Sequence, residues 1–133
     1  MHYTNRIPGW FDYGGLLIVP VKLNGTRLYF MVDSGATYCS INQKLLDKII
    51  AEPTDIKLSI APIGKERLSV ATLRIDTFAV GGTIQKNMLV SIVDFPEGFQ
   101  LDGILGMNFM GKYRITIETD TATLILREIK KKK

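Results

Sequence analysis

The dipeptide Asn24-Gly25 lies between two apolar runs and constrains the fold of this chain more than any other short segment. The first run covers residues 16–23 and the second covers residues 26–32, and both are rich in residue types that favour β-strands. Asn and Gly both tolerate the positive φ angles that a two-residue type I′ turn requires. The sequence therefore predicts an antiparallel β-hairpin at this place.

The rest of the chain shows the same preference for short strands separated by turn residues. Apolar or alternating runs predict further strands at residues 56–60, 66–80, 88–93, 114–119 and 123–127. A helix is expected at residues 43–51, with Ser40 or Asn42 as its N-cap and an apolar stripe of Leu45, Leu46, Ile49 and Ile50. Residues 106–111 form at most one helical turn. Many short strands with so little helix indicate an all-β protein, either a small barrel or a sandwich.

The length and charge of the chain indicate one domain with a basic end. With 133 residues it is expected to form a single domain, and its formal charge is +4. The four residues Lys130 to Lys133 carry all of that excess, so the rest of the chain is neutral overall. We expect residues 128–133 to be a solvated, disordered tail, and contact of the tail with a nucleic acid or an anionic membrane is the lesser alternative. No basic stretch interleaved with aromatic residues occurs elsewhere, so no nucleic-acid partner is expected.

Several kinds of catalysis are excluded by the residues that the chain lacks. Its one histidine is His2 and its one cysteine is Cys39, so it has no base for a serine or cysteine nucleophile and no ligand set for zinc. It has no glycine-rich phosphate-binding motif, and we expect neither a metal nor another cofactor. The apolar stretch at residues 16–19 is far too short to span a membrane, and the first residues do not resemble a signal peptide. A cytoplasmic location is the default expectation.

Carboxylate chemistry remains, and Asp33 is its best candidate. Asp33 directly follows the strand predicted at residues 26–32, and Gly35 permits a tight turn, so the side chain is held at a rigid edge. A single carboxylate is a weak catalyst of hydrolysis because it has no acid partner. Two carboxylates within hydrogen-bond distance share one proton, so one can act as a base and the other as an acid. The other candidates are expected to be structural: Asp102, a second carboxylate near a glycine turn, and Cys39, a small buried residue beside the Asp33 loop.

Two segments give the chain a resemblance to the retropepsin-like aspartic proteases. They are Asp33-Ser34-Gly35-Ala36 at the end of the predicted strand and, later in the chain, Ile104-Leu105-Gly106. The resemblance extends over residues 16–127 and implies a small closed β-barrel of the acid-protease type with one or two short helices. It implies that Asp33 is the catalytic acid, that Ser34 braces the facing loop across a dimer, and that the Ile-Leu-Gly segment packs behind the catalytic loop. The turn Pro62-Ile63-Gly64-Lys65 lies where the family has its substrate-binding flap.

The resemblance also implies an assembly and a function. Such proteases need two aspartate loops and this chain carries one, so a homodimer is expected. We expect a protease domain at residues 15–127, with the segment 1–14 and the last hairpin, 114–127, contributing to the dimer interface. The expected activity is that of an aspartic endopeptidase, in which two copies of Asp33 activate a water that hydrolyses a peptide or protein substrate. The alternative is a catalytically silent member of the same fold that serves as a dimerisation or peptide-binding module, and a fragment of a larger protease is a weaker alternative.

Overall fold

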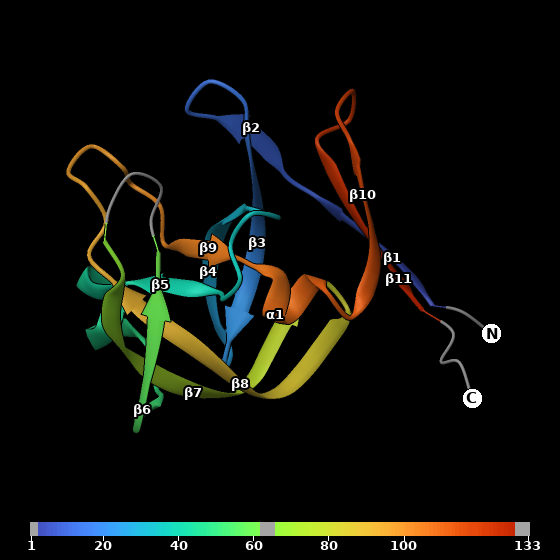
Figure 1. Cartoon of the computed structure of the whole chain (residues 1–133). Coiled ribbons are helices and arrows are strands. Elements are labelled where there is room, and N and C mark those ends of the chain that lie inside the picture. The colour runs from blue at the N-terminus through green and yellow to red at the C-terminus, as the bar shows by residue number, and fades with distance from the viewer. Residues whose placement is uncertain (1–2, 62–65, 130–133) are drawn as a thin grey trace.

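The computed structural model describes residues 3–61 and 66–129, and nearly all of its regular structure is β-strand (Figure 1). The strands are β1 Thr4–Pro8, β2 Trp10–Asp12, β3 Leu16–Leu23, β4 Thr26–Val32, β5 Ser40–Asn42, β6 Glu52–Ile60, β7 Leu68–Val80, β8 Thr83–Val93, β9 Gly103–Leu105, β10 Tyr113–Glu118 and β11 Thr123–Glu128. Two short helices accompany them, the 3₁₀-helix η1 Gln43–Lys48 and the α-helix α1 Met107–Met110. The predicted all-β class is confirmed. Within the two described ranges, no helix is long and apolar enough to cross a bilayer.

Six of the strands close into a barrel. Neighbouring strands are hydrogen-bonded in the order β3-β4-β9-β5-β8-β7, and β3 also pairs with β7, which closes the ring. Strands β2 and β6 extend the same sheet beyond the ring. Closure removes most of the exposed edges that an open sheet of this size would present to other chains. The prediction of a small closed barrel is thereby confirmed.

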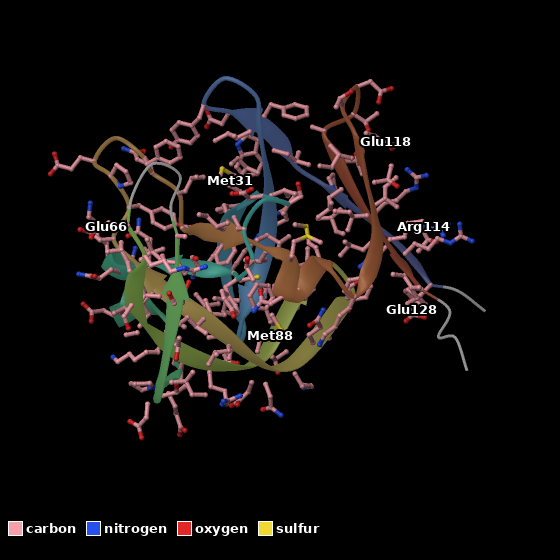
Figure 2. All side chains as sticks on the ribbon, in the orientation of Figure 1. Met31, Glu66, Met88, Arg114, Glu118 and Glu128 are labelled. Atoms are coloured by element: carbon pink, nitrogen blue, oxygen red, sulfur yellow. The ribbon has the colours of Figure 1, made fainter. Side chains whose placement is uncertain are left out.

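A second sheet of three strands has the order β1-β11-β10. Strands β10 and β11 form the predicted last hairpin, and β1 pairs antiparallel with the other edge of β11. Strand β1 has no signal in the sequence, because Ile7 is its one buried residue and the strand therefore lacks an alternating pattern. On the outer side of this sheet, Arg6 donates to Glu118 at 2.9 Å, and Figure 2 shows Arg114 and Glu118 projecting from β10.

The β3–β4 hairpin has the turn that its sequence predicts. Asn24 and Gly25 have positive φ angles of 49° and 88°, as a type I′ turn requires. Along β4 the side chains alternate, since Phe30 is fully buried in the barrel whereas Tyr29 is 39% exposed. The alternation places Asp33, just after the last residue of β4, on the same face as Tyr29 and away from the core.

Three phenylalanines from distant parts of the chain build the centre of the barrel. The ring of Phe30 in β4 meets the ring of Phe78 in β7 edge-on, with their centroids 6.0 Å apart. Phe78 lies 5.0 Å from Phe109 of α1, and all three side chains are fully buried. Burial of one such side chain stabilises the fold by about 2–3 kcal/mol. Because a helix of four residues has little stability of its own, this packing holds α1 in place behind the candidate site.

A smaller apolar cluster covers the opposite face of the sheet. Ile18, Phe95 and Leu101 are buried in it, and Met31 and Ile104 are partly buried beside them. Met31 and Ile104 are register partners in the β4–β9 pair. The loop at residues 94–102 therefore lies against the face of the sheet that carries Asp33.

The helix after β5 differs from its prediction. It is a 3₁₀-helix that ends at Lys48, not a helix that continues to residue 51, and Ile50 is 83% exposed instead of lying on an apolar stripe. Its N-cap is Asn42, one of the two predicted, whose side chain accepts a hydrogen bond from the Lys44 N–H. Long-range contacts explain the early end, because the side-chain amide of Asn24 donates to the Ile50 carbonyl at 2.6 Å. The chain thus leaves the helical path to meet the β3–β4 turn.

The bounds of several strands also differ from prediction. Strand β6 begins at Glu52 and contains Pro53, which was expected to end the helix. β6 is an edge strand, and an edge tolerates a residue without a backbone N–H. Strand β8 begins at Thr83, earlier than residue 88. Strand β5 was not predicted, and Ser40, the other candidate N-cap, lies in it and shares a 2.7 Å hydrogen bond with Ser91 of β8.

Candidate active site

Asp33 begins a tight loop at the end of β4. Its backbone N–H donates to the Leu105 carbonyl of β9 at 3.0 Å, so the parallel β4–β9 pairing continues up to the aspartate itself. Its Oδ1 accepts a hydrogen bond from the Gly35 N–H at 2.9 Å, and its carbonyl accepts one from the Ala36 N–H at 3.2 Å. The half-buried carboxylate is therefore oriented by its own loop, while Oδ2 has no hydrogen-bond partner among the described residues.

The loop crosses directly over the end of β9. An added Cβ at Gly106 would lie 2.7 Å from the Tyr38 carbonyl carbon and oxygen and 2.9 Å from the Ala36 carbonyl oxygen. The backbone at Gly106 is extended, with φ −109°, so the requirement for glycine comes from lack of space. The next N–H group, of Met107, donates to the Ala36 carbonyl at 2.8 Å. The Asp-Ser-Gly-Ala loop and the Ile-Leu-Gly segment are thus brought into direct contact.

Asn108 holds the far side of the same loop. Its backbone N–H donates to the Thr37 carbonyl at 2.9 Å, and its side-chain Oδ1 accepts from the Cys39 N–H at 2.7 Å. The side-chain Nδ2 donates to the Leu89 carbonyl of β8 at 2.9 Å. Asn108 therefore connects the loop to α1 and to the barrel wall. Asn108 was not predicted as a positioning residue, because a lone Asn in a short helix forms no pattern. Its position two residues after Gly106 is the one signal for it in the sequence.

Cys39 ends the loop as a fully buried free thiol, as expected. Its Sγ accepts a hydrogen bond from the Gly106 N–H at 3.3 Å. Burial raises the pKa of the Cys39 thiol to about 12, because the thiolate would lose its hydration. A thiol in this state is a poor nucleophile, so we interpret Cys39 as a structural link between the loop and the end of β9.

The raised pKa of Cys39 predicts a loss of stability in alkaline solution. The ordinary pKa of the thiol is 9.0, so from pH 9 upward the unfolded chain loses a proton that the folded chain keeps. Its stabilising contribution is complete below pH 9 and is lost as the pH rises toward 12, with a slope of about 1.4 kcal/mol per pH unit. Urea unfolding at several alkaline pH values should give a steeper fall for the wild type than for Cys39→Ser, whose hydroxyl does not titrate there. Equal slopes for the two proteins would contradict the burial of a neutral thiol.

Asp102 cannot supply the second carboxylate of a pair within one chain. Its Oδ2 accepts a hydrogen bond from the Tyr29 N–H at 2.8 Å, and its own N–H donates to the Tyr29 carbonyl at 3.2 Å. Tyr29 and Asp33 are separated by four residues of extended chain, which corresponds to about 13 Å. Asp102 therefore lies at the opposite end of the β4–β9 pair from Asp33, where it fixes the start of β9.

Ser34 lies exposed in the Asp33 loop. Two predicted segments lie outside the described ranges: the flap, Pro62-Ile63-Gly64-Lys65, and the basic tail, Lys130 to Lys133. Within residues 3–61 and 66–129, no group of three or more His, Cys, Asp or Glu side chains could hold a metal ion. The role of Asp33 as a catalytic acid stays a prediction at this point.

The fold is found in proteins of known structure. A retropepsin-like aspartic protease from Rickettsia conorii is similar with a TM-score of 0.68 and 18% identity, over 96% of this chain and 94% of that one. The retroviral protease-like domain of Ddi1 from Leishmania major is similar with a TM-score of 0.51 and 20% identity, over 82% of this chain and 86% of that domain. The barrel is therefore that of the retropepsin-like class.

The sequence itself identifies the family. The pattern of the aspartyl protease family matches residues 19–109, a stretch that includes both the Asp33 loop and Gly106. This chain belongs to the aspartyl protease family. No curated protein sequence matches it at a significant level.

Proposed function

We propose that this protein is an aspartic endopeptidase that works as a homodimer, with Asp33 of each copy forming the catalytic pair. The single observation that carries the proposal is the rigid Asp33 loop, in which Oδ1 is oriented by the Gly35 N–H and Oδ2 has no partner among the described residues. The family match supports the reaction class. A peptide or protein is the expected substrate.

The proposed mechanism follows from two carboxylates held close together. Repulsion between like charges prevents both from being ionised, so the pair carries one proton. The ionised Asp33 takes a proton from a water molecule, and the water oxygen attacks the peptide carbonyl. The protonated Asp33 of the other copy gives its proton to the carbonyl oxygen, and proton transfer to the amine then accompanies cleavage. The pair thus supplies both the base and the acid that one carboxylate lacks.

Three features support a second copy as the source of the other carboxylate. The sequence has one Asp-Ser-Gly loop, and the carboxylate of Asp102 is already hydrogen-bonded to the Tyr29 N–H. Ser34 is exposed, and its hydroxyl has no hydrogen-bond partner within the described residues. In the three-stranded sheet, β1 and β10 each pair on one side alone in the described part of the chain, which leaves edges for a symmetric partner.

The proposal predicts that specific activity depends on protein concentration. If active sites form only in the dimer, hydrolysis per chain of a mixture of fluorogenic peptides should rise with concentration and then level off. Sedimentation velocity over the same range should show monomer converting to dimer with the same midpoint. Constant specific activity in solutions that contain only monomer would contradict a shared active site.

A further inference from the structure

A shallow groove lies on the outside of the barrel, at the point along β3 where its strand partner changes from β2 to β7. Strand β2 pairs with this edge of β3 as far as Ile18, and β7 pairs with the same edge of β3 from Lys22 onward. Residues 19–21 have no strand partner on this side within the described ranges, and Pro20 in the gap has no backbone N–H to leave unpaired. The groove has a volume of about 230 Å³ and is lined by Pro20, Val21, Lys22, Arg27, Ala79 and Gly81.

Two cations stand opposite each other beside this groove. Lys22 of β3 and Arg27 of β4 are direct cross-strand partners, and both are exposed. Like charges in such a pair destabilise a sheet. The one ion pair found in the described part of the chain is elsewhere, between Arg6 and Glu118, so no carboxylate neutralises the pair. An anionic group placed between the two side chains would remove their repulsion.

Arg27 lies beside a pair of exposed aromatic side chains. The guanidinium carbon of Arg27 lies 5.9 Å from the ring centroid of Tyr29. The ring of Tyr29 in turn packs against that of Trp10, with the centroids 5.2 Å apart, and the two residues are 39% and 43% exposed. An arginine this close to an aromatic ring is attracted to it, which favours arrangements of the Arg27 side chain beside the groove. Exposed aromatic rings and arginine are also the residue types that contribute most to binding energy at protein interfaces.

We propose that this groove binds an acidic segment of another polypeptide. Its carboxylates would lie between Lys22 and Arg27, and its apolar side chains would lie against Pro20 and the neighbouring aromatic rings. A nucleic acid matches the surface less well, because it requires an array of several cations and the chain outside Lys130 to Lys133 is neutral overall. The proposal does not depend on peptide hydrolysis, so it stands or falls separately from the proposed function.

The test measures binding of a fluorescein-labelled peptide of about ten residues in which Glu alternates with Ala, the length and extended form of a typical strand ligand. The protein carries Asp33→Asn so that no cleavage interferes. We expect the peptide to bind and to change the fluorescence of Trp10, the one tryptophan of the chain, while a Gln-Ala peptide binds much more weakly. Lys22→Gln with Arg27→Gln should weaken binding roughly tenfold, since each exposed charge pair contributes modestly.

The chain contains a matched control for this experiment. Lys44 of η1 and Lys57 of β6 are also exposed cations, and neither lines the groove nor lies in a segment expected at the dimer interface. Substituting both with Gln removes the same charge and should leave the affinity unchanged within about twofold. Equal weakening by the two double variants would overturn the proposal, because it would indicate attraction by net charge alone. Absence of binding, or equally tight binding of a single-stranded oligonucleotide of matched charge, would overturn it as well.

Discussion

Replacing Asp33 with Asn should abolish peptide hydrolysis and leave the protein folded. The amide can neither take the proton from water nor carry the proton that the pair shares, so turnover should fall by roughly 10³-fold or more. The fold should survive because the amide oxygen can still accept the Gly35 N–H, which donates to Oδ1 at 2.9 Å in the wild type. Turnover of a fluorogenic peptide and thermal unfolding, measured on the same preparation, check both parts.

The matched control for this substitution is Asp47→Asn. Asp47 lies exposed in η1, so the variant loses the same charge in a different part of the chain and should keep full activity. Residual hydrolysis by Asp33→Asn above about a tenth of the wild-type rate would place the chemistry at another residue. The silent peptide-binding module would be favoured if the wild type hydrolysed no peptide and if the wild type and Asp33→Asn bound peptides with equal affinity.

Replacing Gly106 with Ala should destabilise the protein more than any exposed substitution. The added Cβ would lie 2.7 Å from the Tyr38 carbonyl and 2.9 Å from the Ala36 carbonyl oxygen, and both are backbone groups that cannot rotate away. The loop that begins at Asp33 must therefore move from β9. We expect a loss of about 3 kcal/mol in the free energy of unfolding, as for other overpacked sites, and a loss of activity in the fraction that stays folded. Urea unfolding and turnover per folded chain are the measurements.

Gly82→Ala is the control for the glycine substitution. A Cβ at Gly82 would meet nothing closer than the Asn5 side chain at 3.6 Å, which is an ordinary contact. The free energy of unfolding should change by less than about 1 kcal/mol, and activity should not change. If Gly106→Ala were as stable and as active as this control, the loop would not depend on its close contact with β9.

The features that the sequence predicted correctly are those that depend on neighbouring residues. The turn at Asn24-Gly25 follows from the φ angles that those two residues tolerate, and the buried positions of β4 follow from alternation along one strand. Asp33 could be placed at a strand end for the same reason. The single turn of α1 and the last hairpin likewise have local signals.

The features that the sequence missed depend on residues far apart in the chain. Strand β1 exists because β11, more than a hundred residues later, supplies its hydrogen bonds. η1 ends early because Asn24 donates to the Ile50 carbonyl. Strand β5 has three residues, and its pairing with β8 and β9 cannot be read from so short a segment.

The candidate site divides in the same way. The loop at Asp33 and the segment ending at Gly106 have recognisable sequences, and the resemblance to the retropepsin-like proteases connects them. The contacts that hold the two segments together have no recognisable sequence. The bridge made by Asn108 and the hydrogen bond from the Gly106 N–H to Cys39 Sγ form only when α1 packs beneath the loop. The sequence thus indicates the reacting group but not the side chains that position it.

Mixing wild-type protein with the Asp33→Asn variant tests most directly whether the active site is shared between two copies. When the variant is in threefold excess and subunits exchange freely, random pairing leaves about one wild-type chain in four with a wild-type partner. If the active site is shared, activity per wild-type chain should fall to about a quarter, at a concentration where sedimentation shows the dimer. If a fluorescent label shows that subunits exchange and activity per wild-type chain nevertheless stays unchanged in the mixture, the shared aspartate pair is contradicted.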